Sequence, residues 1–279
     1  MKKGEKRMKK IYVCLLSFAS LNFVSDAFAE ETSQAQVSLP PSASNFTSAQ
    51  REEIEKIATE YLAKHPDVIT NALQAAMIKQ QQEEIAKIEK AVAENKDKIF
   101  KDAADPVGGN PKGTQSLVVF LDPYCGYCKK MHGELDTLLK TNKNVKVVFK
   151  DLPIMGQGSL MAVKAMLAAK EQGKYDQLQA AIFSSDKHLT KKQILKIASS
   201  LGIDVKKLEE DMKSKALQAR IDQGLELAKA LGIDKTPTLI IGETKVLPGY
   251  VTAEELDKKL KDIAKSPSAA QQEVSKKAS

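Results

Sequence analysis

A strand that runs straight into a pair of cysteines constrains this chain more than any other feature. The stretch from Leu117 to Leu121 is continuously apolar, which predicts a strand buried on both faces. Pro123 ends that strand, and a helix is predicted to begin at Cys125 and to include Cys128. The first turn of a helix has free backbone N–H groups and the positive end of the helix dipole, and both favour a thiolate. We therefore predict that Cys125 is an attacking thiol and that Cys128, one turn inward, resolves a mixed disulfide.

Two other roles for a Cys-x-x-Cys pair compete with exchange chemistry. A structural zinc site needs about four ligands, whereas the whole chain has three cysteines and three histidines. His132 follows Cys128 within the same predicted helix, but no second ligand pair stands elsewhere in the sequence, so we predict no metal site. A purely structural disulfide across so short a loop would gain little stability from chain entropy. We favour exchange chemistry, and both alternatives stay open.

The first 29 residues have the anatomy of a secretory signal peptide. A basic region extends through Lys10, an apolar stretch follows from Ile11 to about Val24, and Ala27-Phe28-Ala29 forms a small-x-small cleavage site. No other stretch reaches the roughly 18 apolar residues that a membrane span needs. The mature chain would then be exported, and it would carry one cysteine pair in an oxidising compartment, which favours exchange over cross-linking.

The charge of the chain gives little support to a nucleic-acid partner. The formal net charge is +7, from 43 Lys and Arg against 36 Asp and Glu. Residues 1–29 hold six of those basic residues and two of the acidic ones, so the remainder carries 37 against 34, or about +3. No basic stripe with interleaved aromatic residues is present, and we predict no nucleic-acid partner.

The segment between the signal peptide and the cysteine domain is predicted to be a leader followed by helices. Residues 30–47 are rich in Ser, Gln, Ala and Pro and predict a flexible leader. Residues 48–104 have a helical pattern that His65-Pro66 interrupts. From Asp67 to about Phe100 a thin apolar stripe follows a largely polar helix, which cannot bury itself alone. The stripe lies either on the chain's own second domain or on a copy of itself. We favour self-association, because a turn-rich linker at 105–113 follows.

Residues 105–264 alternate strand and helix in the manner of one α/β domain, and 265–279 form a polar, flexible tail. The first strand, the cysteine helix and the next strand predict a parallel strand pair with a crossover helix. A helical insertion covers about 159–231, with Ser159 as a helix N-cap. The predicted elements are a strand at 117–121, a helix from Cys125, a strand at 145–149, short helices through 231, strands at 238–241 and 245–247, and a helix from Thr252.

This order, with a Cys-x-x-Cys at a helix start and Thr236-Pro237 before a strand, resembles the DsbA family of bacterial periplasmic thiol-disulfide oxidoreductases. The resemblance implies an α/β thioredoxin fold with a helical insertion, preceded by an N-terminal helical oligomerisation segment. It also implies that Thr236-Pro237 is cis and packs beside the cysteine pair. The backbone of Thr236 would then be free to bind a client strand.

Other residues are similar to the isomerase DsbC rather than to the DsbA oxidase. The dipeptide between the cysteines is Gly126-Tyr127, and Leu247-Pro248-Gly249-Tyr250 comes at the end of the last strand, as in DsbC. The acid that the oxidase carries six residues before its first cysteine falls on Val119 here. The helical segment resembles those through which DsbA-like proteins dimerise or trimerise. Such an assembly holds two or more catalytic sites around one client, which helps an isomerase.

The resemblance implies a thiol:disulfide oxidoreductase that forms or reshuffles disulfide bonds in exported proteins, as a dual oxidase and isomerase. Its implied partners are cysteine-containing clients, a membrane redox partner and further copies of this chain, bound through residues 48–100 as a homodimer or trimer. No cofactor is implied beyond the redox-active disulfide. The implied site consists of the catalytic Cys125 and Cys128, the tuning residues Gly126 and Tyr127, and the substrate-binding Thr236 and Pro237.

The implied location is the periplasm, with loose association with the outer membrane left open. The alternative from another class is a non-catalytic, surface-associated or adhesive protein on a thioredoxin scaffold. A copper-binding relative would need more soft ligands than the two cysteines provide.

Overall fold

The computed structural model describes residues 46–265. The predicted signal peptide at 1–29, almost all of the leader and the tail beyond 265 lie outside the described residues. The chain divides into two compact units, of which one ends at His65 and the other begins at Pro66. Between residues 46 and 265, no helix is both long and apolar enough to cross a membrane.

The first unit contains helix α1 (Ser48–Lys64), which begins where the sequence predicts. Thr47 caps it through a reciprocal pair of hydrogen bonds: the Gln50 N–H donates to Thr47 Oγ1 at 3.3 Å, and the Thr47 N–H donates to Gln50 Oε1 at 2.9 Å. None of its side chains is buried, although four large apolar residues are present, namely Ile54, Ile57, Tyr61 and Leu62.

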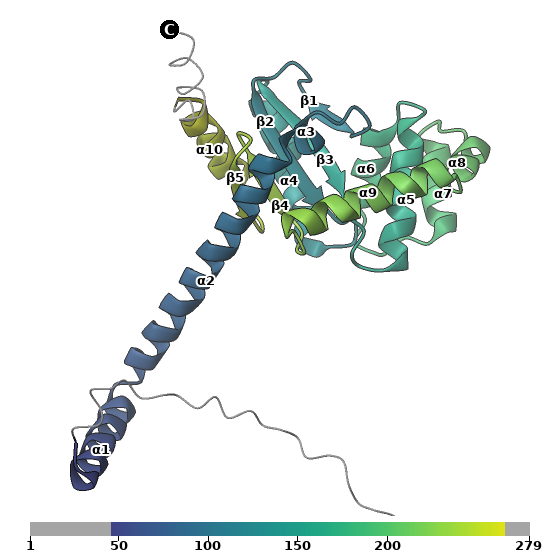
Figure 1. Cartoon of the computed structure of the whole chain (residues 1–279). Helices are drawn as coiled ribbons and strands as arrows, with labels where there is room; N and C mark the ends of the chain where they lie inside the picture. Colours follow the sequence, from purple (N-terminus) through teal and green to yellow (C-terminus); the bar gives the residue numbers. More distant parts are fainter. Residues whose placement is uncertain (1–45, 266–279) are drawn as a thin grey trace, which may run out of the picture. The chain divides into compact units, whose positions relative to one another are not determined.

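Five strands form the sheet of the second unit, in the order β1-β3-β2-β4-β5 (Figure 1). Strands β2 and β3 are parallel, and every other neighbouring pair is antiparallel. The predicted strand–helix–strand unit and the later hairpin are therefore confirmed. The strands are β1 (Val107–Gly109), β2 (Gln115–Leu121), β3 (Val145–Asp151), β4 (Thr238–Ile241) and β5 (Lys245–Pro248).

Strand β1 occupies part of the stretch that the sequence analysis assigned to a linker. Gly109 has a φ of +75°, and a Cβ built on it would lie 2.5 Å from Leu139 Cδ2 and 2.6 Å from the Val145 carbonyl oxygen. Glycine is needed here because β1 approaches both the neighbouring strand and a helix closely. An edge strand therefore lies within a stretch whose residue types are typical of turns.

One face of the sheet packs on a large apolar core made with most of the helices. Leu117, Val119 and Leu121 of β2 point into it, and so do Cys128 and Met131 from the cysteine helix. The helices that contribute to this core match the predicted helical block and closing helix: α4 (Gly126–Thr141), α5 (Gln157–Lys170), α6 (Tyr175–Phe183), α7 (Lys191–Ser200), α8 (Val205–Asp211) and α10 (Ala253–Lys265).

The opposite face is covered by α9 (Lys215–Leu231), α3 (Lys96–Phe100) and the end of α2 (Pro66–Glu94), as Figure 1 shows. Val118 and Phe120 of β2 pack there against Val92, Ile99 and Phe100, all of which are buried. Residues 92–100 thus contribute to the core on this face of the sheet. This packing differs from the predicted domain limit at residue 105.

Helix α2 packs only in part on the chain's own domain, which is one of the two alternatives that the sequence left open for the apolar stripe. Its last third lies on the chain's own domain, where Ile85 and Ile88 pack beside α9. Glu89 Oε1 accepts the Val246 N–H at 3.4 Å and so occupies part of the edge of β5. Its first half is exposed, and 54% of Ile69 and 61% of Leu73 remain accessible to solvent. This exposed half is the part available for association with another molecule.

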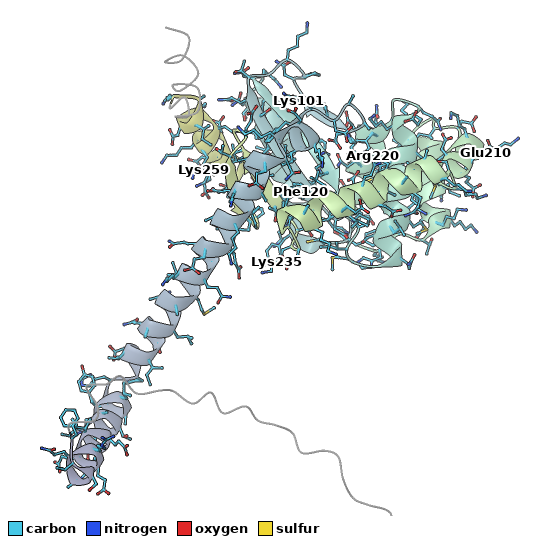
Figure 2. All side chains as sticks on the ribbon, viewed as in Figure 1. Lys101, Phe120, Glu210, Arg220, Lys235 and Lys259 are labelled. Carbon is cyan, nitrogen blue, oxygen red and sulfur yellow. The ribbon has the colours of Figure 1, made fainter. Side chains whose placement is uncertain are left out.

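A buried ionic network joins α3, β3 and α9. Lys150 Nζ lies 2.5 Å from Asp105 Oδ2 and donates to the Lys98 carbonyl oxygen at 2.8 Å. Arg220, labelled on α9 in Figure 2, binds Asp105 and also Asp102, the latter at 3.0 Å. Removal of one partner from such a buried pair leaves an uncompensated charge. The network therefore fixes α3 on the sheet.

Candidate active site

The two cysteines lie at the junction of β2 and α4, with different exposure. Cys125 is the N-cap residue of α4, in an extended conformation, and 9% of it is accessible. Cys128 lies in the first turn of the helix and is fully buried. Both are free thiols in this structure. The outer cysteine is thus the one that a second molecule can reach.

The peptide bond between Thr236 and Pro237 is cis, as the family resemblance implied. The Cys125 thiol donates to the Thr236 carbonyl oxygen at 3.4 Å, so this loop lies directly beside the cysteine pair. Two hydrogen bonds hold the loop: the Gly249 N–H donates to the Pro237 carbonyl oxygen at 2.8 Å, and Thr238 Oγ1 donates to the Lys235 carbonyl oxygen at 2.8 Å. The cis-proline loop and the start of α4 therefore lie together at one site.

Cys128 is held as a neutral thiol. Burial raises the pKa of Cys128 well above its ordinary value, and hydrogen bonds from the Thr236 side chain and the Asp122 backbone offset only part of that rise. The Asp122 N–H donates to Cys128 Sγ at 3.5 Å. A protonated, buried thiol is a poor nucleophile. Burial therefore disfavours a thiolate at Cys128.

The residues between the cysteines face solvent. Tyr127 is 63% exposed, and Lys130 Nζ lies 5.4 Å from the centre of its ring. A Cβ on Gly126 would meet no atom within 4 Å, so space does not explain that glycine. The neighbouring Lys129 amino group is bound to the Ser185 carbonyl oxygen. Gly126 and Tyr127 thus form a surface beside Cys125, and their tuning role stays a prediction.

Asp122 organises the site, and the sequence analysis assigned it no role. Its carboxylate is fully buried and accepts three hydrogen bonds from neutral donors. Oδ1 accepts from the Tyr124 N–H at 2.7 Å and from Ser159 Oγ at 2.7 Å, and Oδ2 accepts from the Met155 N–H at 2.9 Å. Asp122 thereby joins the cysteine loop to the loop after β3 and to α5. The only signal in the sequence is an acid followed by proline directly after an apolar strand.

This arrangement also corrects the predicted start of α5. Ser159 was expected to cap that helix, but the helix begins at Gln157 after Gly156, whose φ is +91°. Ser159 is fully buried inside the helix, and its hydroxyl is used for Asp122. The pattern of the sequence could not distinguish a serine that caps a helix from one that faces a buried acid.

Tyr124 completes the wall beside Cys125. Its hydroxyl donates to the Leu189 carbonyl oxygen at 2.7 Å, and its ring stacks on His188 with 4.3 Å between centroids. A Cβ on Gly158 would lie 2.7 Å from the Tyr124 ring. The residue before Cys125 is therefore fixed by contacts from two other segments, the loop at 188–189 and the start of α5 at Gly158.

A second buried carboxyl lies at the end of β3. Asp151 pairs with Leu121 across the sheet and accepts a hydrogen bond from the Tyr175 hydroxyl at 2.9 Å. Burial raises the pKa of Asp151 to about 7, although the Tyr175 hydrogen bond opposes that rise. Val119, which stands where the oxidase carries its acid, is fully buried in the apolar core.

No set of zinc ligands is present in the part of the chain that the structure describes. Between residues 46 and 265, no group of three or more His, Cys, Asp and Glu side chains is placed to hold a metal ion. His132 instead stacks on Phe183 with 4.8 Å between ring centroids, and its Nδ1 lies 3.7 Å from Asp136.

Comparison with known families decides the assignment of the fold. The family described as Thioredoxin matches residues 101–262, which is more than half of the chain. The chain belongs to the thioredoxin family. The matched residues include β2, the cysteine helix α4 and the cis-proline loop.

Solved thioredoxin structures extend the likeness to thiol chemistry. A thioredoxin-like oxidoreductase from Silicibacter pomeroyi is 34% identical, with a TM-score of 0.59, over 62% of this chain and 99% of that one. The thiol-disulfide exchange protein alpha-DsbA2 from Wolbachia pipientis is 30% identical, with a TM-score of 0.59, over 63% of this chain and 95% of that one. A periplasmic thioredoxin-like protein from Salmonella enterica serovar Typhimurium is 26% identical, with a TM-score of 0.52, over 60% of this chain and 94% of that one.

Curated relatives of this thioredoxin fall into two groups. The thiol:disulfide interchange protein DsbA of Burkholderia cepacia is 25% identical over 186 residues, which cover 62% of this chain and 86% of the relative. The Na(+)/H(+) antiporter NhaA of Herminiimonas arsenicoxydans is 27% identical over 147 residues. That match covers 52% of this chain but 24% of the antiporter, so the chain spans about a quarter of that relative's length. Together with the structures, these findings confirm the resemblance to DsbA-type proteins.

Proposed function

We propose that this protein is a periplasmic thiol:disulfide oxidoreductase that forms and reshuffles disulfide bonds in exported proteins. The observation that carries the proposal is the contact of Cys125 Sγ with the Thr236 carbonyl oxygen at 3.4 Å, beside a fully buried Cys128. One sulfur is accessible, the second is held behind it, and a backbone carbonyl of a cis-proline loop marks where a client chain would lie. The DsbA relatives and the periplasmic Salmonella neighbour support the same reaction and compartment.

In the reductive direction the Cys125 thiolate attacks one sulfur of a client disulfide. A new S–S bond forms to Cys125, the client S–S bond breaks, and the released client sulfur leaves as a thiolate that takes up a proton. Cys128 then loses its proton and attacks Cys125 Sγ, so that an S–S bond forms between the two cysteines, the S–S bond between Cys125 and the client breaks, and the second client sulfur leaves as a thiolate that takes up a proton. The cysteine pair is oxidised, the client disulfide is reduced to two thiols, and electrons and protons balance. The reverse sequence oxidises a client, and attack by another client thiolate on the mixed disulfide isomerises it.

The unequal burial of the two cysteines gives this sequence its order. Cys128 stays protonated while it is buried, because burial raises its pKa. It reacts only when Cys125 presents a disulfide sulfur one helical turn away. A membrane redox partner would restore the starting state, and no cofactor beyond the cysteine pair takes part in the proposed cycle.

The experiment that tests the reaction uses two single-cysteine variants of the full chain. Cys128→Ser should accumulate a mixed disulfide with a client protein, because the resolving thiol is missing. Cys125→Ser should form none and should lose exchange with glutathione. Retention of every activity by the Cys125→Ser variant would contradict the proposal and would favour a non-catalytic, adhesive role.

We further propose that the exposed half of α2 and the apolar residues of α1 join copies of this chain into a dimer or trimer. An isomerase benefits from several catalytic sites around one client. The solvent-exposed Ile69 and Leu73 lie one turn apart on α2 and are the residues to change. Deletion of the whole segment would be a poor test, since residues 92–100 belong to the sheet's own core.

Replacement of Ile69 and Leu73 by Glu, in the full chain, should therefore release monomers and reduce isomerisation of scrambled substrate, with simple dithiol exchange kept. Asn71, which is exposed on the same helix, provides the matched control as Asn71→Glu. The mass of each variant in solution gives the readout. Unchanged mass in the double variant would refute association through this part of α2.

The same preparation gives the balance between oxidase and isomerase from its redox equilibrium with glutathione. A potential near −120 mV, which is the strong-oxidant end of the range, in a monomer would favour a disulfide-donating oxidase. A less oxidising potential in an oligomer would favour the isomerase or dual function that we propose.

A further inference from the structure

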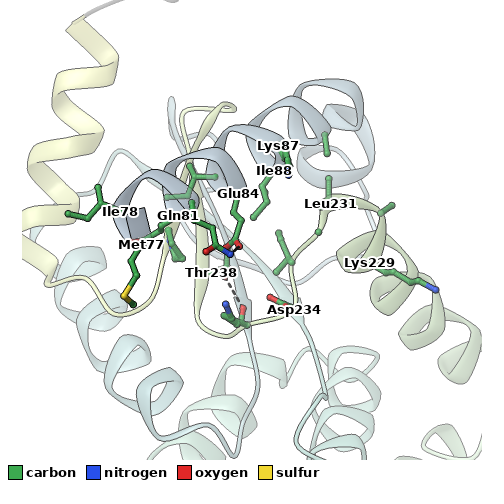
Figure 3. Close-up of a pocket in the computed structure, with 18 of the residues that line it drawn as sticks. Met77, Ile78, Gln81, Glu84, Lys87, Ile88, Lys229, Leu231, Asp234 and Thr238 are labelled. Carbon is green, nitrogen blue, oxygen red and sulfur yellow. Dashed lines mark hydrogen bonds between the residues drawn. The ribbon is translucent and has the colours of Figure 1, made fainter. Parts of the chain in front are cut away.

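A wide groove lies between α2 and the C-terminal end of α9. Its volume is about 910 Å³, within the size range of ligand sites in proteins. Figure 3 shows α2 on one side of it, with Met77, Ile78, Gln81 and Glu84 labelled, and the end of α9 on the other. All of the lining residues belong to the unit that begins at Pro66.

The groove has a fixed apolar floor and an adaptable, exposed wall. Leu231 and Ile233 are 1% and 4% accessible and form part of the second core. On the wall, 64% of Met77 and 49% of Ile78 are exposed, which is unusual for large apolar side chains beside a concave surface. Methionine is unbranched and polarisable, so it can pack against many different side chains. The wall suits an apolar occupant whose sequence varies.

The groove is continuous with the cis-proline loop at Thr236-Pro237. Lys235 and Thr238 both line it, and they are the residues on either side of Thr236-Pro237. The hydrogen bond between Thr238 Oγ1 and the Lys235 carbonyl oxygen ties them together. Thr236 is the residue whose carbonyl oxygen contacts Cys125. A chain joined to Cys125 and lying along this loop would therefore enter the groove within a few residues.

We propose that this groove binds the polypeptide that flanks the reacting cysteine of an unfolded client, in an extended form and through its apolar side chains. The inference rests on the proposed function. An unfolded exported protein exposes the aliphatic and aromatic residues that its native state buries, and the exposed Met77 and Ile78 offer them a complementary surface. The edge of β5 is partly taken, because Glu89 accepts the Val246 N–H. Recognition in the groove thus depends on side chains rather than on strand addition.

The charged residues around the groove fit a client of general sequence. Glu84, Lys87, Lys229 and Asp234 all line it and carry both signs. A surface with mixed charge does not select strongly for acidic or basic segments, whereas a surface of one sign would steer and restrict its partners. Selectivity would then come from the unfolded state of the client and from the presence of a cysteine.

The test compares two substrates in variants of the full chain. Ile78→Glu and, separately, Met77→Glu place a charge on the groove wall at side chains that are already exposed, so the fold is not expected to suffer. Ala86→Glu is the matched control, because Ala86 is exposed on the same helix and does not line the groove. The substrates are reduced, unfolded ribonuclease A and glutathione, which is too small to occupy the groove.

For each groove variant we expect the ratio of the rate constant with unfolded ribonuclease A to that with glutathione to fall about fivefold to tenfold, the range expected from loss of a half-buried aliphatic contact. The control should keep the ratio of the unchanged protein. Equal ratios in all four proteins would overturn the groove, and so would an equal fall in Ala86→Glu, since added charge alone would then explain it.

Three outcomes separate this inference from its premises. A change of mass in solution in Ile78→Glu would assign the groove to contact between copies of this chain and would overturn its role in client binding. If the unchanged protein failed to exchange with glutathione at all, the proposed function itself would be refuted. Intact glutathione exchange with equal client rates would refute the groove and leave the proposed function standing.

Discussion

The buried carboxylate of Asp122 gives the most stringent test of how the site is held. It accepts hydrogen bonds from the Tyr124 N–H, the Met155 N–H and the Ser159 hydroxyl. A buried donor that loses its acceptor costs about 1–3 kcal/mol. Asp122→Ala leaves all three donors without an acceptor, so we expect the free energy of unfolding to fall by about 3–9 kcal/mol. That fall is comparable with the whole stability of many domains, about 5–15 kcal/mol.

Two milder variants make the reasoning quantitative. Asp122→Asn keeps one acceptor oxygen, which can serve Tyr124 and Ser159 from the Oδ1 position, and turns its amide group towards Met155. The Met155 N–H is then left without an acceptor, so we expect the free energy of unfolding to fall by about 1–3 kcal/mol. Ser159→Ala removes a donor together with its hydrogen bond, and we expect a loss of only about 1 kcal/mol.

Urea unfolding of the reduced proteins, with equal m-values as the check on two-state behaviour, measures these differences. We expect the order Ser159→Ala, then Asp122→Asn, then Asp122→Ala, from the least to the most destabilised. The glutathione equilibrium of Asp122→Asn should shift as well, since the cysteine loop is anchored through this carboxylate. If Asp122→Ala cost no more than Ser159→Ala, the three hydrogen bonds would not be what holds the loop.

Three further predictions concern accessibility, pH and packing. Iodoacetamide should modify Cys125 at least tenfold faster than Cys128 at pH 7, by mass spectrometry of the reduced protein, because burial keeps Cys128 protonated; equal rates would contradict the burial argument. The pKa of Asp151 is about 7 in the folded protein against an ordinary 3.8, so the folded state holds a proton that the unfolded state releases. Its contribution to stability therefore falls as pH rises from about 4 to 7 and is level above. Asp151→Asn should remove that slope in urea titrations, and an unchanged slope would contradict the assignment. Gly158→Ala should destabilise the protein by about 1–3 kcal/mol, because the new methyl group would lie 2.7 Å from the Tyr124 ring; a neutral effect in the same assay would mean that the ring moves freely.

The cysteine pair and the elements beside it were predictable because their signals are local. An apolar run such as Leu117–Leu121 predicts a buried strand, proline ends it, and the spacing of Cys125 and Cys128 places both in one helical turn. The helical insertion predicted at about 159–231 also agrees closely with the observed helices, which extend from 157 to 231. The cis form of Thr236-Pro237 was accessible only through resemblance to a family, since a Thr-Pro pair alone carries no such signal.

The parts that sequence reasoning missed depend on contacts between distant residues. Asp122, Met155 and Ser159 form one hydrogen-bonded unit across 37 positions, and nothing in the order of residues pairs them. Gly109 resembled a linker residue, although it lies in an edge strand where a helix and a strand leave no room for a side chain. In each case the residue type has several common roles, and a contact with a residue distant in the sequence decides which role it has.

The sequence by itself determined the order of the elements and the placement of the cysteines: one cysteine at a helix start, a second one turn inward, and a thioredoxin order of strands and helices around them. These features follow from backbone periodicity and from the spacing of neighbouring residues. Only the tertiary structure decided that Asp122 anchors the loop, that residues 92–100 complete the sheet's core, and that α2 forms a groove leading to Thr236. Burial and long-range hydrogen bonds are properties of the assembled chain, because each needs partners that only folding brings together.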